Sequence, residues 1–300
     1  MQTEPTRLEA RRVRFRWNDT SPEFIPGDPF SSHFINVLHL LLPEGERWFC
    51  RVYRQAEPLI TDARLRDDVR GFVKQEAMHA NAHAILLDHY AARGVDTAPF
   101  LRKMNFLFER LLSDSPPGFA RFAAENPREW LVARVALIAA IEQFTCMLGQ
   151  WVLGAKALDE AGADPTMLDL LRWHGAEEVE HRSVAFELFE HLSGNYPLRV
   201  GTMAIVLPVL LGIWFHGARF MLEADPSVPE SMRRNELALV PEFERVARAT
   251  DRMPSLAEFF RAAGRYVVPS YRPENEGSVD AALAYLARSP AVSSLRAQAS

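Results

Sequence analysis

The chain has 300 residues, 48% of them apolar, and is long enough to bury a core that needs no disulfide. Its formal net charge of −5 disfavours a nucleic-acid-binding protein, which would carry a broad basic surface, so we expect no nucleic-acid partner. The two cysteines, Cys50 and Cys146, belong to no CxxC pair or Cys/His cluster, which favours a reduced cytoplasmic protein over a zinc finger or a secreted disulfide scaffold.

Residues 1–31 are predicted to form an N-terminal arm. The arm carries several arginines together with Glu4 and Glu9, and no apolar run follows them, so it is unlike a secretory signal peptide. Beyond the arm, apolar residues recur at steps of three and four through most of the chain, whereas alternating β-branched runs are rare. This periodicity predicts an all-α fold.

Four long helices are predicted within residues 32–193, in a single domain that spans residues 1–300. Pro and Gly residues and capping side chains such as Asp62 and Asp164 mark their ends. The connection at 94–127 holds several prolines and a short helix at 101–112, and its length suits a crossover. The four helices are expected at residues 32–56, with an interruption near Pro43, and at 62–93, 128–161 and 165–192.

Residues 194–300 are predicted to hold an apolar fifth helix followed by peripheral helices. The segment Val200–Ala218 carries no formal charge and is just long enough to span a bilayer. Pro208 and His216 lie within it and favour a buried core helix. Peripheral contact with a membrane is the alternative.

Two of the long helices contain a Glu-x-x-His step, Glu76 with His79 and Glu178 with His181. Residues three apart lie on the same face of a helix, so each step can present a carboxylate and an imidazole to one ion. A single step is usually a solvated surface pair. Two steps on separate helices favour a metal site, because the other two long helices each offer a carboxylate among apolar neighbours.

Those carboxylates are Glu46 in the first helix and Glu142 in the third. Glu142 follows the apolar run 137–141, where burying an unpaired carboxylate would cost several kcal/mol. Glu46 precedes Trp48-Phe49-Cys50, and Glu44 or Glu57 could take its place.

The pattern Glu, Glu-x-x-His, Glu, Glu-x-x-His on four successive helices resembles the ligand set of the ferritin-like di-metal carboxylate superfamily. The resemblance implies a ferritin-like four-helix bundle with additional C-terminal helices. Over a wider stretch, which includes residues 43–47 and 173–178, the chain is similar to a bacterial family of predicted metal-dependent hydrolases. The ligand set does not by itself support hydrolysis. The ligands that the resemblance implies are Glu46, Glu76, His79, Glu142, Glu178 and His181.

His174 stands four residues before Glu178 and seven before His181, on the same helical face. A histidine at this step resembles the extra, seventh ligand of the para-aminobenzoate N-oxygenases, which are di-iron enzymes that oxidise an aryl amine with dioxygen. We therefore expect His174 to bind metal, with a core histidine that only forms hydrogen bonds as the alternative. His83, four residues after His79, is expected behind the ligands or in the pocket.

Many relatives of this type have an Asp before the ligand Glu, and it orients the histidine of the opposite motif. This chain has Gln75 and Glu177 at those positions, so Glu177 is expected to orient a ligand and Gln75 lacks the charge to do the same. Cys50 and Cys146 follow Glu46 and Glu142 by one turn and are expected to pack there, with a thiolate ligand as the alternative. The residues expected to shield the site are Phe72, Phe144, Trp173, Trp48, Phe49 and Trp151.

The expected function is a di-iron oxygenase or oxidase that uses dioxygen and an external electron donor to hydroxylate, desaturate or N-oxygenate an apolar or aromatic small molecule. Carboxylates and imidazoles without thiolates suit two iron ions, with two manganese ions or a mixed pair as alternatives. A metal-dependent hydrolase with a bridging water and a non-catalytic ferritin-type protein are the other hypotheses. A homodimer is a further option, and the location is expected to be cytoplasmic, with or without membrane association.

Overall fold

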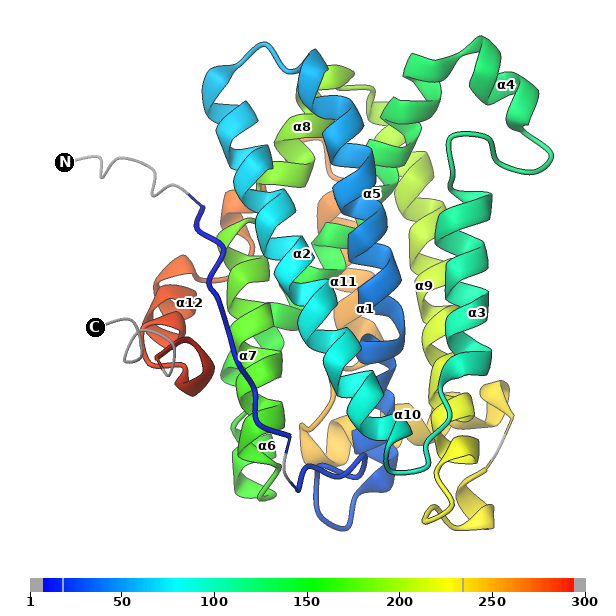
Figure 1. Cartoon of the computed structure of the whole chain (residues 1–300), viewed down its shortest axis with the longest axis vertical. Helices are drawn as coiled ribbons and strands as arrows, with labels where there is room; N and C mark the ends of the chain where they lie inside the picture. Colours follow the sequence, from blue (N-terminus) through cyan, green and yellow to red (C-terminus); the bar gives the residue numbers. More distant parts are fainter. Residues whose placement is uncertain (1–7, 18, 234, 294–300) are drawn as a thin grey trace.

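The computed structural model describes residues 8–17, 19–233 and 235–293, and every regular element in these ranges is a helix (Figure 1). The all-α prediction is confirmed. The elements are α1 (Pro29–Ala56), η1 (Glu57–Leu59), α2 (Ala63–Ala91), α3 (Ala98–Phe106), η2 (Leu107–Leu111), α4 (Ala120–Glu125), α5 (Pro127–Gly154), α6 (Lys156–Glu160), α7 (Pro165–Glu180), α8 (Val184–Leu192), α9 (Tyr196–Ala224), η3 (Glu230–Met232), α10 (Glu236–Thr250), α11 (Leu256–Tyr266), η4 (Pro273–Asn275) and α12 (Val279–Leu286).

Helices α1, α2, α5 and α7 form the central bundle. Helix α1 packs mainly against α2, and α5 packs mainly against α7. In Figure 1, α1 and α7 run upward while α2 and α5 run downward. The connection between α2 and α5 climbs the side of the bundle through α3. Because of this climb, α2 and α5 run in the same direction although they are consecutive helices of the bundle. This crossover gives the bundle its ferritin-like arrangement.

Three of the four bundle helices begin at an aspartate whose side chain accepts a hydrogen bond from the backbone N–H three residues later. Asp28, Asp62 and Asp164 cap α1, α2 and α7 in this way, at 3.0, 2.8 and 2.9 Å. Each cap satisfies one of the N–H groups that a helix start leaves unpaired. The local sequence therefore fixes where these helices begin.

The bundle helices differ from the predicted ranges in three places. Helix α1 begins at Pro29 and runs through Pro43 without interruption, so the predicted arm of 1–31 is too long. The third predicted helix stops at Gly154, where Arg172 donates hydrogen bonds to the carbonyls of Val152 and Ala155. The fourth stops at Glu180, where Arg182 binds the carbonyl of Val179. The arginine at the end of α5 comes from α7, whereas the one at the end of α7 lies in the turn that follows it; each satisfies carbonyls that a helix end leaves unpaired.

Helices α5 and α7 approach each other closely beside the candidate site. A Cβ atom added to Gly175 would lie 2.7 Å from the Cα of Gly149, so neither position has room for a larger residue. The contact fixes the distance between α5 and α7 at this point. Helix α7 carries the second Glu-x-x-His step.

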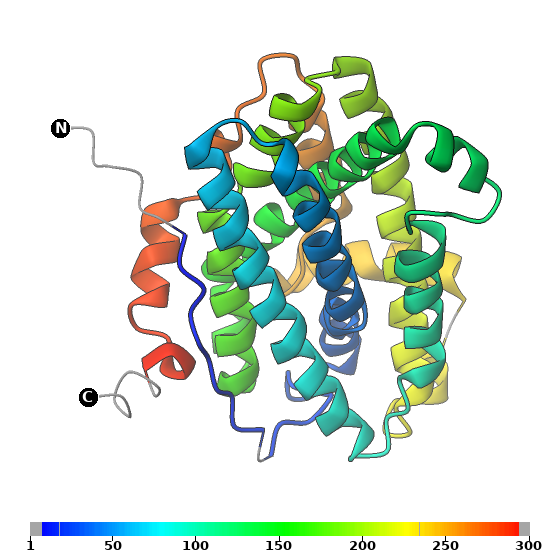
Figure 2. The same ribbon diagram turned by 45° about the horizontal axis from the view of Figure 1, so that its top comes forward.

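The remaining helices cover the bundle. Helix α9 packs on α1 and α5, α10 on α9, α11 on α5 and α9, and α12 on α7 (Figures 1 and 2). Two helices of the described chain, α5 and α9, are long and apolar enough to cross a membrane; the most apolar window is 72% buried in α5 but only 33% buried in α9. The prediction that the fifth helix is a core helix is therefore wrong for its outer face.

Candidate metal centre

Seven buried side chains in the middle of the bundle form two adjacent groups of metal-ligand atoms. Within each group the atoms lie within 4.8 Å of one another, and Glu178 belongs to both. The groups are Glu46, His79, His174 and Glu178, and Glu76, Glu142, Glu178 and His181. Every one of the predicted ligands therefore lies in one of the two groups.

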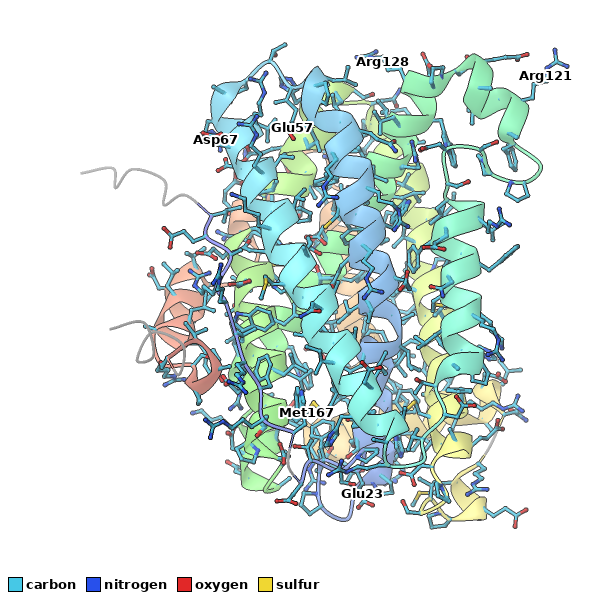
Figure 3. All side chains as sticks on the ribbon, in the orientation of Figure 1. Glu23, Glu57, Asp67, Arg121, Arg128 and Met167 are labelled. Atoms are coloured by element: carbon cyan, nitrogen blue, oxygen red, sulfur yellow. The ribbon has the colours of Figure 1, made fainter. Side chains whose placement is uncertain are left out.

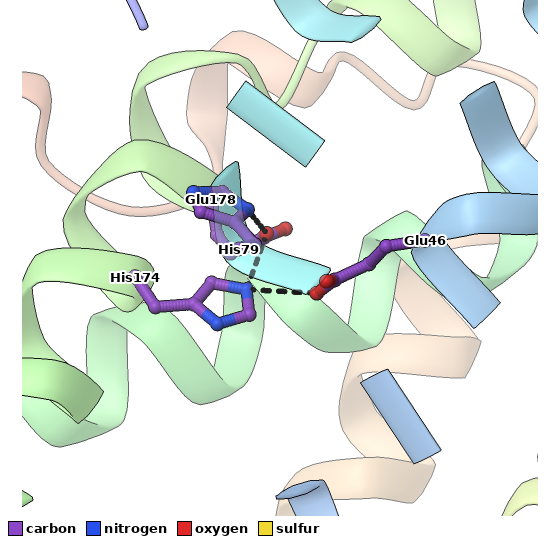
Figure 4. A group of neighbouring side chains, drawn as sticks. All are labelled: Glu46, His79, His174 and Glu178. Atoms are coloured by element: carbon purple, nitrogen blue, oxygen red, sulfur yellow. Dashed lines mark hydrogen bonds and ion pairs between the residues drawn. The ribbon is translucent and has the colours of Figure 1, made fainter. Parts of the chain in front are cut away.

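In the first group, Glu178 faces two histidines (Figure 4). Its Oε1 atom lies 2.8 Å from Nε2 of His174 and 3.4 Å from Nδ1 of His79. The Nε2 atom of His174 also lies 3.4 Å from Oε1 of Glu46, which reaches in from α1. His174 thus presents a ring nitrogen to the same space as the other ligand atoms.

In the second group, His181 Nε2 is central. It lies 3.4 Å from Oε1 of Glu76, 3.2 Å from Oε2 of Glu142 and 3.2 Å from Oε2 of Glu178. Glu178 therefore turns one oxygen toward each group, as a carboxylate that bridges two ions would do.

The two alternatives to Glu46 lie outside both groups. Glu44 pairs with Arg47 on the surface of α1. Glu57 lies at the upper end of the bundle, where Figure 3 labels it, and pairs with Arg70 at 2.7 Å. Their charges are already balanced by arginines near solvent, whereas that of Glu46 is not.

Six buried atoms of the cluster that could bind metal have no hydrogen-bond partner in the described chain. They are both carboxylate oxygens of Glu46 and of Glu142, Oε1 of Glu76, and Nδ1 of His79. Unpaired buried polar atoms are costly, and carboxylates most of all. Because all six lie within the two groups, divalent cations held there would satisfy them together, and the donor set fits a metal centre.

The pKa values of the cluster residues also fit a metal centre. Burial, together with the neighbouring carboxylates, raises the pKa of Glu46, Glu76 and Glu142, and that of Glu142 reaches about 8. Burial alone would lower the pKa of His79 and His181, but the surrounding carboxylates raise both well above the usual range. The protein without metal retains protons where cations would balance the charge, so metal binding should release protons.

The two histidines of the Glu-x-x-His steps are each oriented from the opposite helix. Nε2 of His79 pairs with Oε2 of Glu177 at 2.9 Å, and Nδ1 of His181 pairs with Oε1 of Gln75 at 3.0 Å. Glu177 lies where the sequence predicts it. Gln75 also contacts the ring of a predicted ligand, although as an amide it adds no negative charge behind the ring.

The N-terminal arm contacts the side chains that orient His79 and His181. Arg11 donates hydrogen bonds to Glu177 at 3.0 Å and to Glu180 at 2.7 and 2.9 Å, and Gln75 donates to Glu180 at 2.8 Å. In Figure 1 the arm runs along the outside of α7. It therefore ties the two orienting side chains of the metal centre to the start of the chain.

A chain of three buried histidines leads away from the centre. Nδ1 of His174 lies 2.6 Å from Nε2 of His83, whose Nδ1 lies 2.7 Å from Nδ1 of His39. If His174 held a metal through Nε2, its Nδ1 would carry the proton and donate to His83, which would donate to His39 in turn. Burial lowers the pKa of all three, to about 4 for His174 and about 3 for His39, so the rings are neutral.

We expect His83→Leu to weaken binding of the ion beside His174 by about 10–100-fold while leaving the helical content unchanged, because Nδ1 of His174 loses the acceptor that fixes its tautomer. Competition against a coloured chelator would measure the affinity. His191→Gln, which changes an exposed histidine on α8, should leave the affinity unchanged. Equal affinities in the two variants would mean that His83 has no such role.

The two cysteines are buried thiols near the cluster. Burial raises the pKa of Cys146, and that of Cys50 reaches about 12. Neither sulfur belongs to the two ligand groups of the described chain, and the Sγ atom of Cys50 donates a hydrogen bond to the carbonyl of Val73 at 3.4 Å. The geometry gives no support to a thiolate ligand.

An apolar cavity of about 340 Å³ reaches the four carboxylates. Its walls come from α1, η2, α5 and α9, and they include Trp48, Phe49 and Phe144. Two other predicted shielding residues lie behind ligand rings instead: the ring centre of Phe72 is 4.6 Å from that of His181, and Trp173 is 5.0 Å from His79. Trp151 lines a smaller pocket on the side of His83 and His174.

Sequence reasoning missed His39 and Arg11. His39 stands seven residues before Glu46, so both lie on one face of α1, and this spacing could have revealed it. Arg11 lies in an extended arm without periodicity, and no signal in the sequence connects it to Glu177.

The fold and the site define a ferritin-like helical bundle with a buried carboxylate and histidine cluster that could bind metal. A family model described as a predicted metal-dependent hydrolase matches residues 9–277, so the chain belongs to that family. No curated protein and no solved structure matches the chain. The predicted resemblance to this family and to the ferritin-like di-metal proteins is confirmed.

Proposed function

We propose that this protein is a metal-dependent hydrolase in which two adjacent ions act on an apolar substrate. The observation that carries the proposal is that Glu178 directs one oxygen to each of two ligand groups at the inner end of an apolar cavity. The description of the family supports hydrolysis over the oxidation that the ligand set alone suggests.

The chemistry divides between the ions and the chain. Two divalent ions held by the cluster would polarise a substrate carbonyl or phosphoryl oxygen and lower the pKa of a bound water. The chain keeps the ligands in one geometry: Glu177 orients His79, Gln75 orients His181, and His83 orients His174. The apolar walls exclude bulk water and favour a substrate with an apolar body.

Oxidation with dioxygen is the second candidate. Four carboxylates and three histidines without a thiolate suit iron or manganese, and a dry apolar cavity would protect a reactive oxidant. This reaction would need an electron donor as a partner. Iron, manganese and a mixed pair are all compatible with the donor set.

Turnover with different metals separates the two reactions. We expect the protein loaded with zinc or manganese under anaerobic conditions to hydrolyse chromogenic esters or phosphoesters of long-chain alcohols. The rate should fall at least about 100-fold in Glu178→Gln, because the shared ligand is lost. Turnover that needs iron, dioxygen and a reductant, with no hydrolysis by the zinc form, would contradict hydrolysis and favour oxidation.

A further inference from the structure

The apolar cavity opens on one side of the molecule. Its inner end holds the buried carboxylates, while its lining also includes three residues with exposed side chains: Ile205 and Val209 of α9, and Leu111 of η2. These side chains are 58%, 47% and 39% exposed. The mouth of the cavity therefore lies between the first half of α9 and η2.

The surface around this mouth is apolar along α9. Between residues 201 and 212 exposed positions recur at steps of three and four, and none of them is polar. A continuous apolar stripe on a solvent-exposed surface is unusual and marks an interaction site. We call this stripe the α9 face; it consists of Gly201, Ala204, Ile205, Pro208, Val209 and Gly212.

Neighbouring elements extend the apolar surface. The Phe106 side chain on α3 is exposed, and so are those of Phe119, which caps α4, and Phe122 on α4. Helix α4 stands out from the body at the corner above α3 in both ribbon views (Figures 1 and 2). Exposed aromatic side chains on a projecting turn are typical of segments that enter the interfacial region of a bilayer.

The same side of the molecule carries cations, although the protein as a whole is acidic. Residues 98–125 contain four Lys and Arg against three Asp and Glu, a formal charge of +1, which leaves −6 on the rest of the chain. Arg102, Lys103, Arg110 and Arg121 are exposed, and Figure 3 shows Arg121 at the outer end of α4. Anionic lipid headgroups would complement this charge.

Helix α9 is fixed to the bundle and cannot leave it to cross a membrane. The indole N–H of Trp214 donates to the carbonyl of Phe34 in α1 at 2.8 Å. A Cβ atom on Gly217 would lie 2.7 Å from the side chain of Val37, so the two helices are in close contact there. Only the outer half of α9 is available, which suits a helix that lies on a bilayer.

We propose that the α9 face, with η2 and α4, docks on a bilayer that contains anionic lipid, and that the cavity takes a long-chain apolar molecule directly from the hydrocarbon. The second part rests on the proposed function, since it places that substrate at the metal centre. A second copy of the chain on this face would seal the mouth of the cavity that leads to the carboxylates. A bilayer leaves the mouth open to apolar molecules.

Flotation tests the docking. We expect the full chain to float with vesicles of phosphatidylcholine and phosphatidylserine, and more weakly with phosphatidylcholine alone. Val209→Glu should lower the partition coefficient by at least about tenfold, because a charge would enter the interface. The matched control is Ile85→Glu on α2, whose side chain is also 47% exposed, and it should float like the wild type. Circular dichroism and metal content establish that both variants fold.

Several outcomes would overturn the docking proposal. These are wild-type protein that stays wholly in the soluble fraction, equal flotation of the two variants, or a wild-type dimer that Val209→Glu converts to a monomer without any vesicle binding. Flotation depends on neither turnover nor bound metal, so the docking result stands even if the proposed hydrolysis fails.

Loading of the cavity is tested separately. A pyrene-labelled long-chain alcohol carried in the vesicles should accept fluorescence energy from Trp48 and Trp214, which line the cavity. Ile213→Phe, which narrows the cavity, should reduce this transfer by at least about tenfold without changing flotation. Vesicle-bound wild-type protein that shows no transfer would contradict entry of the substrate from the hydrocarbon.

Discussion

Glu178→Gln should reduce the bound metal from two ions per chain to one or none. The substitution preserves size, but an amide cannot offer an anionic oxygen to each of the two groups that Glu178 joins. Metal analysis of the purified variant after dialysis would give the stoichiometry. Helical content by circular dichroism should stay close to that of the wild type.

The control for this experiment is Glu160→Gln, which neutralises an exposed carboxylate at the end of α6. It should bind two ions like the wild type. Retention of both ions by Glu178→Gln would show that this carboxylate does not join two metal sites, and the proposed centre would have to be abandoned.

Removal of the ions should lower the melting temperature by about 10 °C. Ions present at about a thousand times their dissociation constants contribute roughly 4 kcal/mol per site, and a chain of this length unfolds with a large entropy change. The metal-free protein is further destabilised because Glu46 and Glu142 are buried without a hydrogen-bond partner in the described chain, each with only one histidine contact, at 3.4 and 3.2 Å. Calorimetry before and after chelation would measure the difference.

The metal-free protein should also lose stability as pH rises from about 6.5 to 8. Burial and neighbouring carboxylates raise the pKa of Glu142 from 4.5 in the unfolded chain to about 8. A carboxyl group with a raised pKa in the folded state stabilises that state at low pH and loses this contribution as pH rises. His79 and His181, whose pKa values are also raised, act in the same direction. Below pH 6.5 protonation of the neutral histidines His39, His83 and His174 opposes the trend.

Glu142→Gln should have opposite effects on stability in the metal-free and the metal-bound protein. Without metal it removes one of several mutually repelling buried carboxylates and should stabilise the protein at pH 8 by an amount on the order of 2 kcal/mol, a few degrees in melting temperature. With metal it removes a ligand and should destabilise. Glu160→Gln should do neither. A metal-free Glu142→Gln protein that melts below the wild type would contradict the charge repulsion proposed for the cluster.

The sequence by itself determines the helical class, the order of the long helices and most of the cluster. Aspartate caps and apolar periodicity are local, so the starts of α2 and α7 follow from short stretches of sequence. The Glu-x-x-His spacing is also local, since 3.6 residues per turn place both side chains on one face. These features could be predicted because none of them depends on a distant part of the chain.

Tertiary structure decides where α5 ends, because Arg172, which binds the carbonyls of Val152 and Ala155, comes from α7. It also brings Arg11 to Glu177 and His39 to His83, contacts between segments far apart in the sequence. The exposed side of α9 depends on which neighbours cover it, and an almost uniformly apolar segment carries no pattern that reveals the side left bare. The apolar mouth of the cavity follows from that packing, whereas the ligands inside it follow from the spacing of residues along each helix.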